Sequence, residues 1–175
     1  QVQSSSVLVI NEGATCTING GTYAANGAGS SIYCKGTVNV YDAAVKAADV
    51  GGVSTVSSGK AYIYDGTTIS GCTYGIQIDS GITYMYGGTV KNCQIGVNQW
   101  GTFTMSDGTI TKNTGEGIHG AGPVKITGGS ITSNGDAGIA QYMDKLTYSG
   151  ATCSGNEGSN IYNMATAVIK SGTIK

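Results

Sequence analysis

The sequence predicts an all-β solenoid, in which short parallel strands coil repeatedly around one hydrophobic core. A pattern of about 21 residues recurs along the 175-residue chain and is most regular between Gly81 and Gln141. A period of this length is typical of solenoids. Within each repeat, apolar and polar residues alternate as in β-strands rather than at helical spacing. Gly-Gly or Asp-Gly pairs precede each Thr–apolar step, and glycine supplies the positive φ angles that sharp corners need.

Each coil should contribute three strands, and about seven coils are expected. The strand after the glycine corner has one inward position per coil, occupied by Tyr23, Val45, Ile69, Val90, Ile110, Ile131, Cys153 and Ile174. The next strand has a second apolar column, formed by Ile10, Ile32, Val53, Ile76, Val97, Ile118, Ile139 and Ile161. The third strand has two inward positions per coil, occupied by Cys16/Ile18, Val38/Val40, Ala61/Ile63, Thr83/Met85, Phe103/Met105, Val124/Ile126, Leu146/Tyr148 and Ala167/Ile169.

The segment Asp42–Asp49 departs from the repeat, because DAAVKAAD could form a short helical turn. Val45 still falls in register, so we expect a degenerate coil and a single domain over residues 1–175. The repeat runs through Val7–Ile10 and Ala167–Lys175 without the polar terminal units that solenoids usually carry. We therefore expect uncapped ends, either because the chain is a fragment of a longer protein or because subunits stack head to tail.

A further column lies three residues after the inward position of the corner strand. Its members are Asn26, Ala48, Cys72, Cys93, Asn113, Asn134 and Asn156. Stacked asparagine side chains can hydrogen-bond to each other and to backbone amides that a tight bend leaves unpaired. Cys72 and Cys93 replace asparagine on adjacent coils, within disulfide range. They are expected to be either bonded to each other or, like Cys16, Cys34 and Cys153, buried thiols, and no CxxC spacing indicates zinc.

With its coil length, its three strands per coil and its column of Asn113, Asn134 and Asn156, the chain resembles the pectate-lyase-like superfamily. The resemblance covers nearly all of the chain and implies a single-stranded right-handed parallel β-helix. It implies no particular activity, because that fold carries lyases, hydrolases, tailspikes, adhesins and passive stalks.

Composition excludes several classes of partner. The net charge is −1 and 11% of the residues are charged, so we expect no nucleic-acid surface. All nine basic residues are lysines, although arginine is the usual reader of phosphate and carboxylate groups. No stretch approaches the roughly 18 apolar residues of a membrane span, so we expect no membrane insertion. No signal peptide is visible, so in a secreted protein Gln1 would be a mature or an artificial start. No cofactor or metal is expected.

Outward positions of the third strand carry tyrosine on three successive coils. These residues are Tyr41, Tyr62, Tyr64, Tyr84 and Tyr86. Adjacent rungs lie about 4.8 Å apart, so the five rings should form one exposed patch. Exposed aromatic patches usually mark binding surfaces, and a sugar ring or a neighbouring fibre is the expected partner. The alternative is that the tyrosines only stabilise the sheet through cross-strand pairs.

The corner strand presents two ranks of mostly hydroxyl side chains. One rank contains Thr68, Thr89, Thr109, Ser130, Thr152 and Thr173, and the other contains Ser70, Lys91, Thr111, Thr132, Ser154 and Lys175. The double rank is similar to the ice-binding face of β-solenoid antifreeze proteins, although two lysines interrupt it and threonine is common on exposed strands.

An enzyme acting on polysaccharides would need two carboxylates roughly 5–10 Å apart. Glu116, Asp136 and Glu157 each come shortly before the second apolar column on successive coils, and His119 follows Glu116. If the chain is an enzyme, Glu116 and Asp136 are the expected general acid and base, with His119 beside them. The resemblance to pectate lyases implies an arginine base, which this chain lacks. Solvated loop residues are the simpler interpretation, so we expect no catalytic residue.

The favoured function is therefore non-catalytic: an extracellular or cell-surface structural and adhesive module. Its expected partners are a surface glycan or further copies of itself, joined head to tail or laterally into a filament or surface fibre. The tyrosine patch would make the contact with glycan or protein. A polysaccharide-active enzyme, either a lyase or a glycoside hydrolase, and an ice-binding protein are the alternatives.

Overall fold

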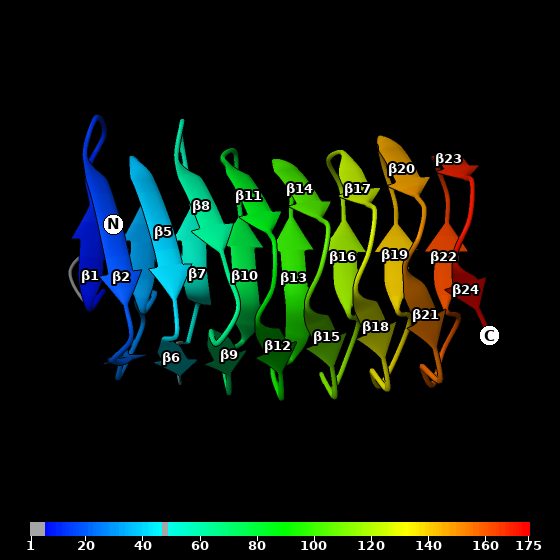
Figure 1. Cartoon of the computed structure of the whole chain (residues 1–175), viewed down its shortest axis with the longest axis horizontal. Helices are drawn as coiled ribbons and strands as arrows, with labels where there is room; N and C mark the ends of the chain where they lie inside the picture. Colours follow the sequence, from blue (N-terminus) through cyan, green and yellow to red (C-terminus); the bar gives the residue numbers. More distant parts are fainter. Residues whose placement is uncertain (1–5, 47–48) are drawn as a thin grey trace.

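The computed structural model describes residues 6–46 and 49–175, and within them it contains twenty-four β-strands and no helix. Successive strands fall in turn into three sheets of parallel strands. The coils stack along the longest axis, and the two termini lie at opposite ends (Figure 1). The predicted β-solenoid is confirmed, with about eight coils and a period of about 22 residues, one coil more than expected. Among the described residues there is no helix long and apolar enough to cross a membrane.

Each coil contributes one strand to each sheet. Sheet A contains β1 (Leu8–Ile10), β4 (Ile32–Cys34), β7 (Gly51–Thr55), β10 (Tyr74–Ile78), β13 (Ile95–Gln99), β16 (Ile118–Gly120), β19 (Ile139–Gln141) and β22 (Ile161–Asn163). Sheet B contains β2 (Thr15–Asn19), β5 (Thr37–Tyr41), β8 (Lys60–Ile63), β11 (Ile82–Met85), β14 (Thr102–Met105), β17 (Val124–Ile126), β20 (Lys145–Tyr148) and β23 (Thr166–Ile169). Sheet C contains β3 (Thr22–Ala24), β6 (Ala44–Lys46), β9 (Thr68–Ser70), β12 (Thr89–Lys91), β15 (Thr109–Thr111), β18 (Ser130–Thr132), β21 (Thr152–Ser154) and β24 (Thr173–Ile174).

The three sheets enclose one core built from the inward columns. Every predicted inward position of sheets B and C pairs with its counterpart on the next coil. Positive φ occurs at the glycine corners as expected, for instance at Gly88 (φ 77°) and Gly108 (φ 100°). Because the side chains repeat with period two along each strand, the outward residues are equally fixed in register.

The first position of the sheet A column was predicted wrongly. Leu8, not Ile10, pairs with Ile32, while Ile10 pairs with Cys34. Ile10 is buried and Leu8 partly buried in the same core, because residues two apart on a strand face the same side. The remaining residues of the predicted column, from Ile32 to Ile161, are in register.

The segment Asp42–Asp49 retains the repeat where it is described. Ala44–Lys46 forms strand β6, in which Val45 is fully buried between Tyr23 and Ile69. Ala48, which was expected in the polar column, lies outside the described residues.

A column of buried glycines marks the place where sheet A begins in five successive coils, from β7 to β19. Its members are Gly52, Gly75, Gly96, Gly117 and Gly138. A Cβ on Gly96 would lie 2.5 Å from the carbonyl oxygen of Gly117 and 2.7 Å from Ile110 Cγ2. Only glycine therefore allows the coil to pass this close to the polar column and to the next coil.

The outermost described coils leave apolar side chains uncovered. At the N-terminal end Val7 is 51% exposed, and at the C-terminal end Ile169 and Ile174 are 52% and 43% exposed. Ile169 and Ile174 occupy inward columns, so their exposure reflects the open face of the last coil.

Candidate functional sites: a tyrosine face and an acidic pocket

The five predicted tyrosines form a continuous stack on sheet B. Tyr41 and Tyr64 lie with ring centroids 4.1 Å apart and planes inclined by 6°. Tyr62 and Tyr84 are stacked at 5.1 Å with the same inclination. Tyr86 joins both columns, with centroids 5.5 Å from Tyr64 and 6.0 Å from Tyr84. We call these five residues the tyrosine face.

Stacking changes which part of each ring is available. Tyr86 is 41% exposed, and the other four tyrosines are partly exposed. Because neighbouring rings cover each other's faces, solvent reaches mainly the ring edges and hydroxyl groups. A hydrogen bond with Tyr41 raises the pKa of Tyr64, with smaller contributions from burial and from the neighbouring phenols. The tyrosine face is thus a row of polar tips held in place by stacked rings.

The polar column is a hydrogen-bonded ladder in the C-terminal half of the chain. Asn113 Nδ2 donates to Asn134 Oδ1 at 2.9 Å, and Asn134 Nδ2 donates to Asn156 Oδ1 at 2.8 Å. Asn160, which was not predicted, ends the described series by accepting from Asn156 Nδ2 at 2.8 Å. Toward the N-terminus, the backbone N–H of Cys93 donates to Asn113 Oδ1 at 3.0 Å.

Asn26 occupies a different environment from the other ladder positions. Asn26 is exposed, and Ala25 is the buried residue at this corner. The N–H of Ala25 donates to Ser31 Oγ at 3.2 Å, so a serine hydroxyl supplies the acceptor that an asparagine supplies elsewhere. The Ser31 hydroxyl in turn donates to the carbonyl oxygen of Lys46 at 3.0 Å.

All five cysteines are thiols in the structure. Cys72 and Cys93 lie in the polar column, and a hydrogen bond between their side chains, together with burial, raises the pKa of Cys93 far above its usual range. Burial raises the pKa of Cys34 to about 11 and that of Cys153 to about 12. Cys16 is the only one of the five that is partly exposed. Within residues 6–46 and 49–175, no group of three His, Cys, Asp or Glu side chains is placed to hold a metal ion.

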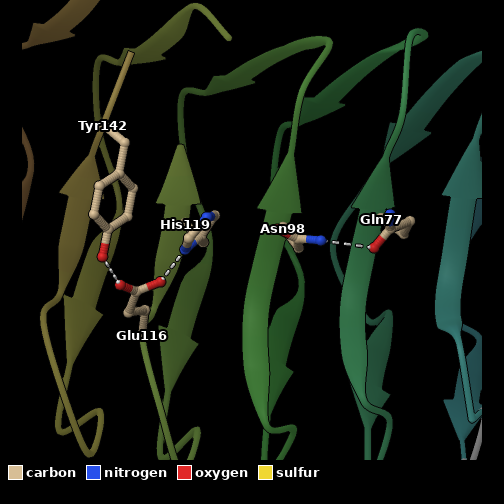
Figure 2. Close-up of polar contacts among 5 residues, drawn as sticks. All are labelled: Gln77, Asn98, Glu116, His119 and Tyr142. Carbon is tan, nitrogen blue, oxygen red and sulfur yellow. Dashed lines mark hydrogen bonds and ion pairs between the residues drawn. The ribbon is translucent and has the colours of Figure 1, made fainter. Parts of the chain in front are cut away.

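Glu116 is the centre of a hydrogen-bonded group on the outer side of sheet A (Figure 2). Its Oε1 accepts from the hydroxyl of Tyr142 at 2.6 Å, and its Oε2 accepts from His119 Nδ1 at 2.5 Å. The His119 and Tyr142 rings also contact each other, with centroids 4.7 Å apart. Glu116 is 8% exposed. Both of its oxygen atoms therefore face donors from the protein, as suits a carboxylate ion.

A pocket of about 290 Å³ lies beside this group. It is lined by Glu116, Asp136, Ala137, Ala140, Tyr142, Ser159 and Tyr162. We call it the acidic pocket. The hydrogen bond to Glu116 is the main cause that raises the pKa of Tyr142 to about 12, and Asp136 adds to the effect through its charge. The phenol therefore stays protonated and keeps donating at neutral pH.

Among the residues that form this hydrogen-bonded group or line the pocket, the sequence indicated Glu116, His119 and Asp136. Glu116 and His119 are in contact, and Asp136 lines the same pocket, whereas exposed Glu157 does not line it. Tyr142 and Tyr162 were missed.

The register of sheet A contains a signal for Tyr142 and Tyr162. The outward column runs from His119 through Ala140 to Tyr162. An alanine between two large side chains leaves a gap, and Tyr142, just past the end of β19, reaches back beside it. Small residues within an outward column thus mark hollows in a solenoid surface.

The same outward column is polar on the N-terminal side of His119. Asn98 Nδ2 donates to Gln77 Oε1 at 3.0 Å, as Figure 2 shows, and Gln77 in turn contacts Asp79. Amide side chains thus pair between β10 and β13. The bonded pair of Glu116 and Tyr142 lies beside β16 and β19, two coils further along the solenoid.

The hydroxyl ranks of sheet C have the predicted register. Thr68, Thr89, Thr109, Ser130, Thr152 and Thr173 pair in sequence, as do Ser70, Lys91, Thr111, Thr132 and Ser154. Some hydroxyls bond to each other, as Thr109 and Ser130 do at 3.3 Å. Lys91 stands within the second rank, and Lys175 follows the end of β24.

Comparison of the chain with protein-family models, with curated proteins and with solved structures finds no match.

Proposed function

We propose that the chain is a non-catalytic structural and adhesive module of the right-handed, pectate-lyase-like type, displayed outside the cell or on its surface. The stacked tyrosine face carries this proposal. Five tyrosines on three successive coils are far more than the fold needs at these positions, since Thr104 and Ser106 occupy the equivalent places on the next coil.

The geometry of the face favours a polymer as its partner. The hydroxyl groups recur from coil to coil along the solenoid axis, and each can donate and accept a hydrogen bond. Stacking fixes the rings before a partner arrives, so binding loses little side-chain entropy. A glycan chain or an extended protein segment, with polar groups repeated along its length, fits such a row.

The exposed ends of the solenoid support self-association as a second part of the proposal. Ile169 and Ile174 present apolar surface on the last coil. Covering one end with another copy would bury this surface and pair the open strands. Light scattering over a range of protein concentrations tests this part, and a monomer at every concentration would contradict it.

The tyrosine face is tested by replacing its tyrosines with the residues of the next coil. In Tyr84→Thr/Tyr86→Ser the fold is retained, because the same residue types occupy the equivalent positions 104 and 106. We expect retention on insoluble chitin, cellulose or peptidoglycan to fall about fivefold or more. The matched control is Tyr33→Ser on sheet A, which introduces the residue found at position 54 of the next coil.

Two outcomes would contradict this assignment. One is equal retention of the native chain and the double variant. The other is an equal loss in the Tyr33→Ser control, which would show that the tyrosine face has no special role.

The polysaccharide-active alternative draws on the acidic pocket, where Glu116 and Asp136 lie together. A general acid must give up a proton to the leaving group. Glu116 instead accepts hydrogen bonds through both oxygen atoms. This geometry favours binding over proton transfer. If the native chain releases reducing ends from a glycan and the Glu116→Gln variant does not, the enzymatic alternative is favoured over binding.

The ice-binding alternative draws on the regular hydroxyl ranks of sheet C. Lys91 stands within them, and Lys46 occupies the same rank at the N-terminal side. Charged, hydrated side chains interrupt a surface that would have to match ice over several coils. Thermal hysteresis at millimolar protein concentration would favour this alternative, and its absence would remove it.

A further inference from the structure

The acidic pocket has the composition of a site for a cation. Glu116 and Asp136 contribute carboxylates, and the lining contains no lysine. His119 bonds to Glu116 but does not line the pocket. A concave site lined by one sign of charge concentrates ligands of the opposite sign.

Two tyrosine rings form a corner of this pocket. The centroids of Tyr142 and Tyr162 lie 6.0 Å apart, and their planes are inclined by 61°. At this inclination the edge of one ring meets the face of the other, and His119 lies against Tyr142, so exposed Tyr162 offers the more open ring face. A cation held near a tyrosine face is attracted by the negative charge of the π system. Tyr142 is held in position by its hydrogen bond to Glu116.

The hydrogen bonds that Glu116 makes within the protein bear on which kind of ligand the pocket can bind. A neutral sugar would be recognised mainly by hydrogen bonds to acceptors that are open to it, yet both Glu116 oxygens already accept bonds within the protein. Asp136 supplies a second carboxylate in the lining, and its charge acts over several ångströms without direct contact. A ligand with a diffuse positive charge uses both the rings and this field.

We propose that the acidic pocket binds an organic ammonium group, with the cation against the ring of Tyr162, beside Tyr142, and facing the carboxylates of Glu116 and Asp136. The volume of about 290 Å³ suits a small head group rather than a large ligand. Tyr162 is 44% exposed, so the group can enter from solvent while the rest of its molecule stays outside. Such a group occurs on free choline-like compounds and on the lysine side chain of a partner protein.

Titration with choline, followed by NMR chemical shifts, tests the proposal. The control ligand is 3,3-dimethylbutan-1-ol, which has the shape of choline without its charge. We expect choline to bind about tenfold more tightly or better, because only the cation gains from the rings and carboxylates. Nα-acetyl-lysine amide, which lacks a free carboxylate, provides the second arm: choline binding more tightly indicates a quaternary head group, and the reverse order indicates a lysine side chain.

Variants locate the binding at this pocket. Asp136→Asn removes one charge, and Tyr162→Leu removes one ring, and each should weaken binding about fivefold or more. Both positions are exposed, so neither change removes a core residue. Tyr33→Leu makes the same kind of change at another outward position of sheet A, outside the tyrosine face and the acidic pocket, and should leave the affinity for the ammonium ligand unchanged.

Three outcomes would overturn the proposal. The first is equal affinity for choline and its neutral isostere with no binding of Nα-acetyl-lysine amide. The second is an absence of saturable binding for both cations. The third is saturable binding that Asp136→Asn and Tyr162→Leu leave intact.

Discussion

The side-chain oxygen of Asn156 accepts two hydrogen bonds from Asn134, one coil earlier in the solenoid. The side-chain Nδ2 of Asn134 donates to it at 2.8 Å and the backbone N–H at 3.0 Å. Asn113 bonds to Asn134 in the same double manner. Each asparagine therefore satisfies a backbone amide of the preceding coil as well as a side chain, and the ladder ties neighbouring coils together at one corner.

Replacing Asn134 with alanine should destabilise the chain by about 2–4 kcal/mol, because the buried donors of Asn113 lose their acceptor. Chemical denaturation of the variant measures this change. Asn26→Ala, at the exposed corner of the first coil, serves as the control and should change stability by less than about 0.5 kcal/mol. Equal effects of the two substitutions would show that the ladder contributes nothing specific.

Gly96→Ala should destabilise the chain by about 3 kcal/mol or more, because the new Cβ overlaps the backbone of Gly117 and the Ile110 side chain. Gly155 has a positive φ of 63° but open space around it. Gly155→Ala therefore measures backbone strain alone, about 1–2 kcal/mol. Thermal unfolding of both variants makes the comparison. A Gly96→Ala variant no less stable than Gly155→Ala would contradict the close packing at the glycine column.

The thiols should differ widely in their reaction with a disulfide reagent at pH 8. Only the thiolate reacts, and the raised pKa values of Cys34, Cys93 and Cys153 keep these side chains protonated as well as buried. Partly exposed Cys16 should react first, and Cys16→Ser should abolish the fast phase. Mass spectrometry of the modified peptides identifies the site. Rapid modification of Cys153 in the folded chain would contradict the structure.

Stability should fall at high pH because of Tyr148. Its single buried O–H is shared between the carbonyl oxygens of Ala151 at 2.8 Å and Thr173 at 3.1 Å, and burial raises its pKa to about 12. In the unfolded chain tyrosine ionises near pH 10. The folded state thus favours the protonated phenol, so its contribution is complete below about pH 10 and is lost as the pH rises toward 12.

Tyr148→Phe separates this effect from other alkaline damage. The variant loses the hydrogen bond that this hydroxyl donates and should be less stable at pH 8 by about 1 kcal/mol. Its stability should then decline less between pH 8 and pH 11 than that of the native chain. Urea denaturation at both pH values gives the comparison, and parallel declines would show that Tyr148 is not responsible.

The repeat made most of the fold predictable. Every coil repeats the same apolar positions, so one regular segment sets the register of its neighbours. The exception at Leu8 and Ile10 has a simple physical reason. Both residues face the core, and a shift by two positions keeps every side chain on its own face. Alternation therefore specifies the face of a strand more strongly than its pairing.

The two sites were less predictable than the fold, because they depend on contacts between side chains of different coils. The pattern placed Tyr62 and Tyr84 side by side, but only the structure shows that their faces are covered by stacking. It placed Glu116 near Asp136, yet Tyr142 reaches Glu116 from another coil, 26 residues away in the chain. Such a contact depends on the gap at Ala140, which a search for charged or aromatic residues overlooks.

The alignment of the inter-coil hydrogen bonds has a mechanical consequence. These bonds run along the long axis, and the two termini lie at its opposite ends (Figure 1). Tension applied between the termini would peel an end coil away bond by bond, so coils would detach singly. Each detachment would lengthen the chain by roughly 75 Å, the extended length of about 22 residues. Force directed across the axis would instead be shared by all strands of a sheet, and the solenoid would resist it far more strongly.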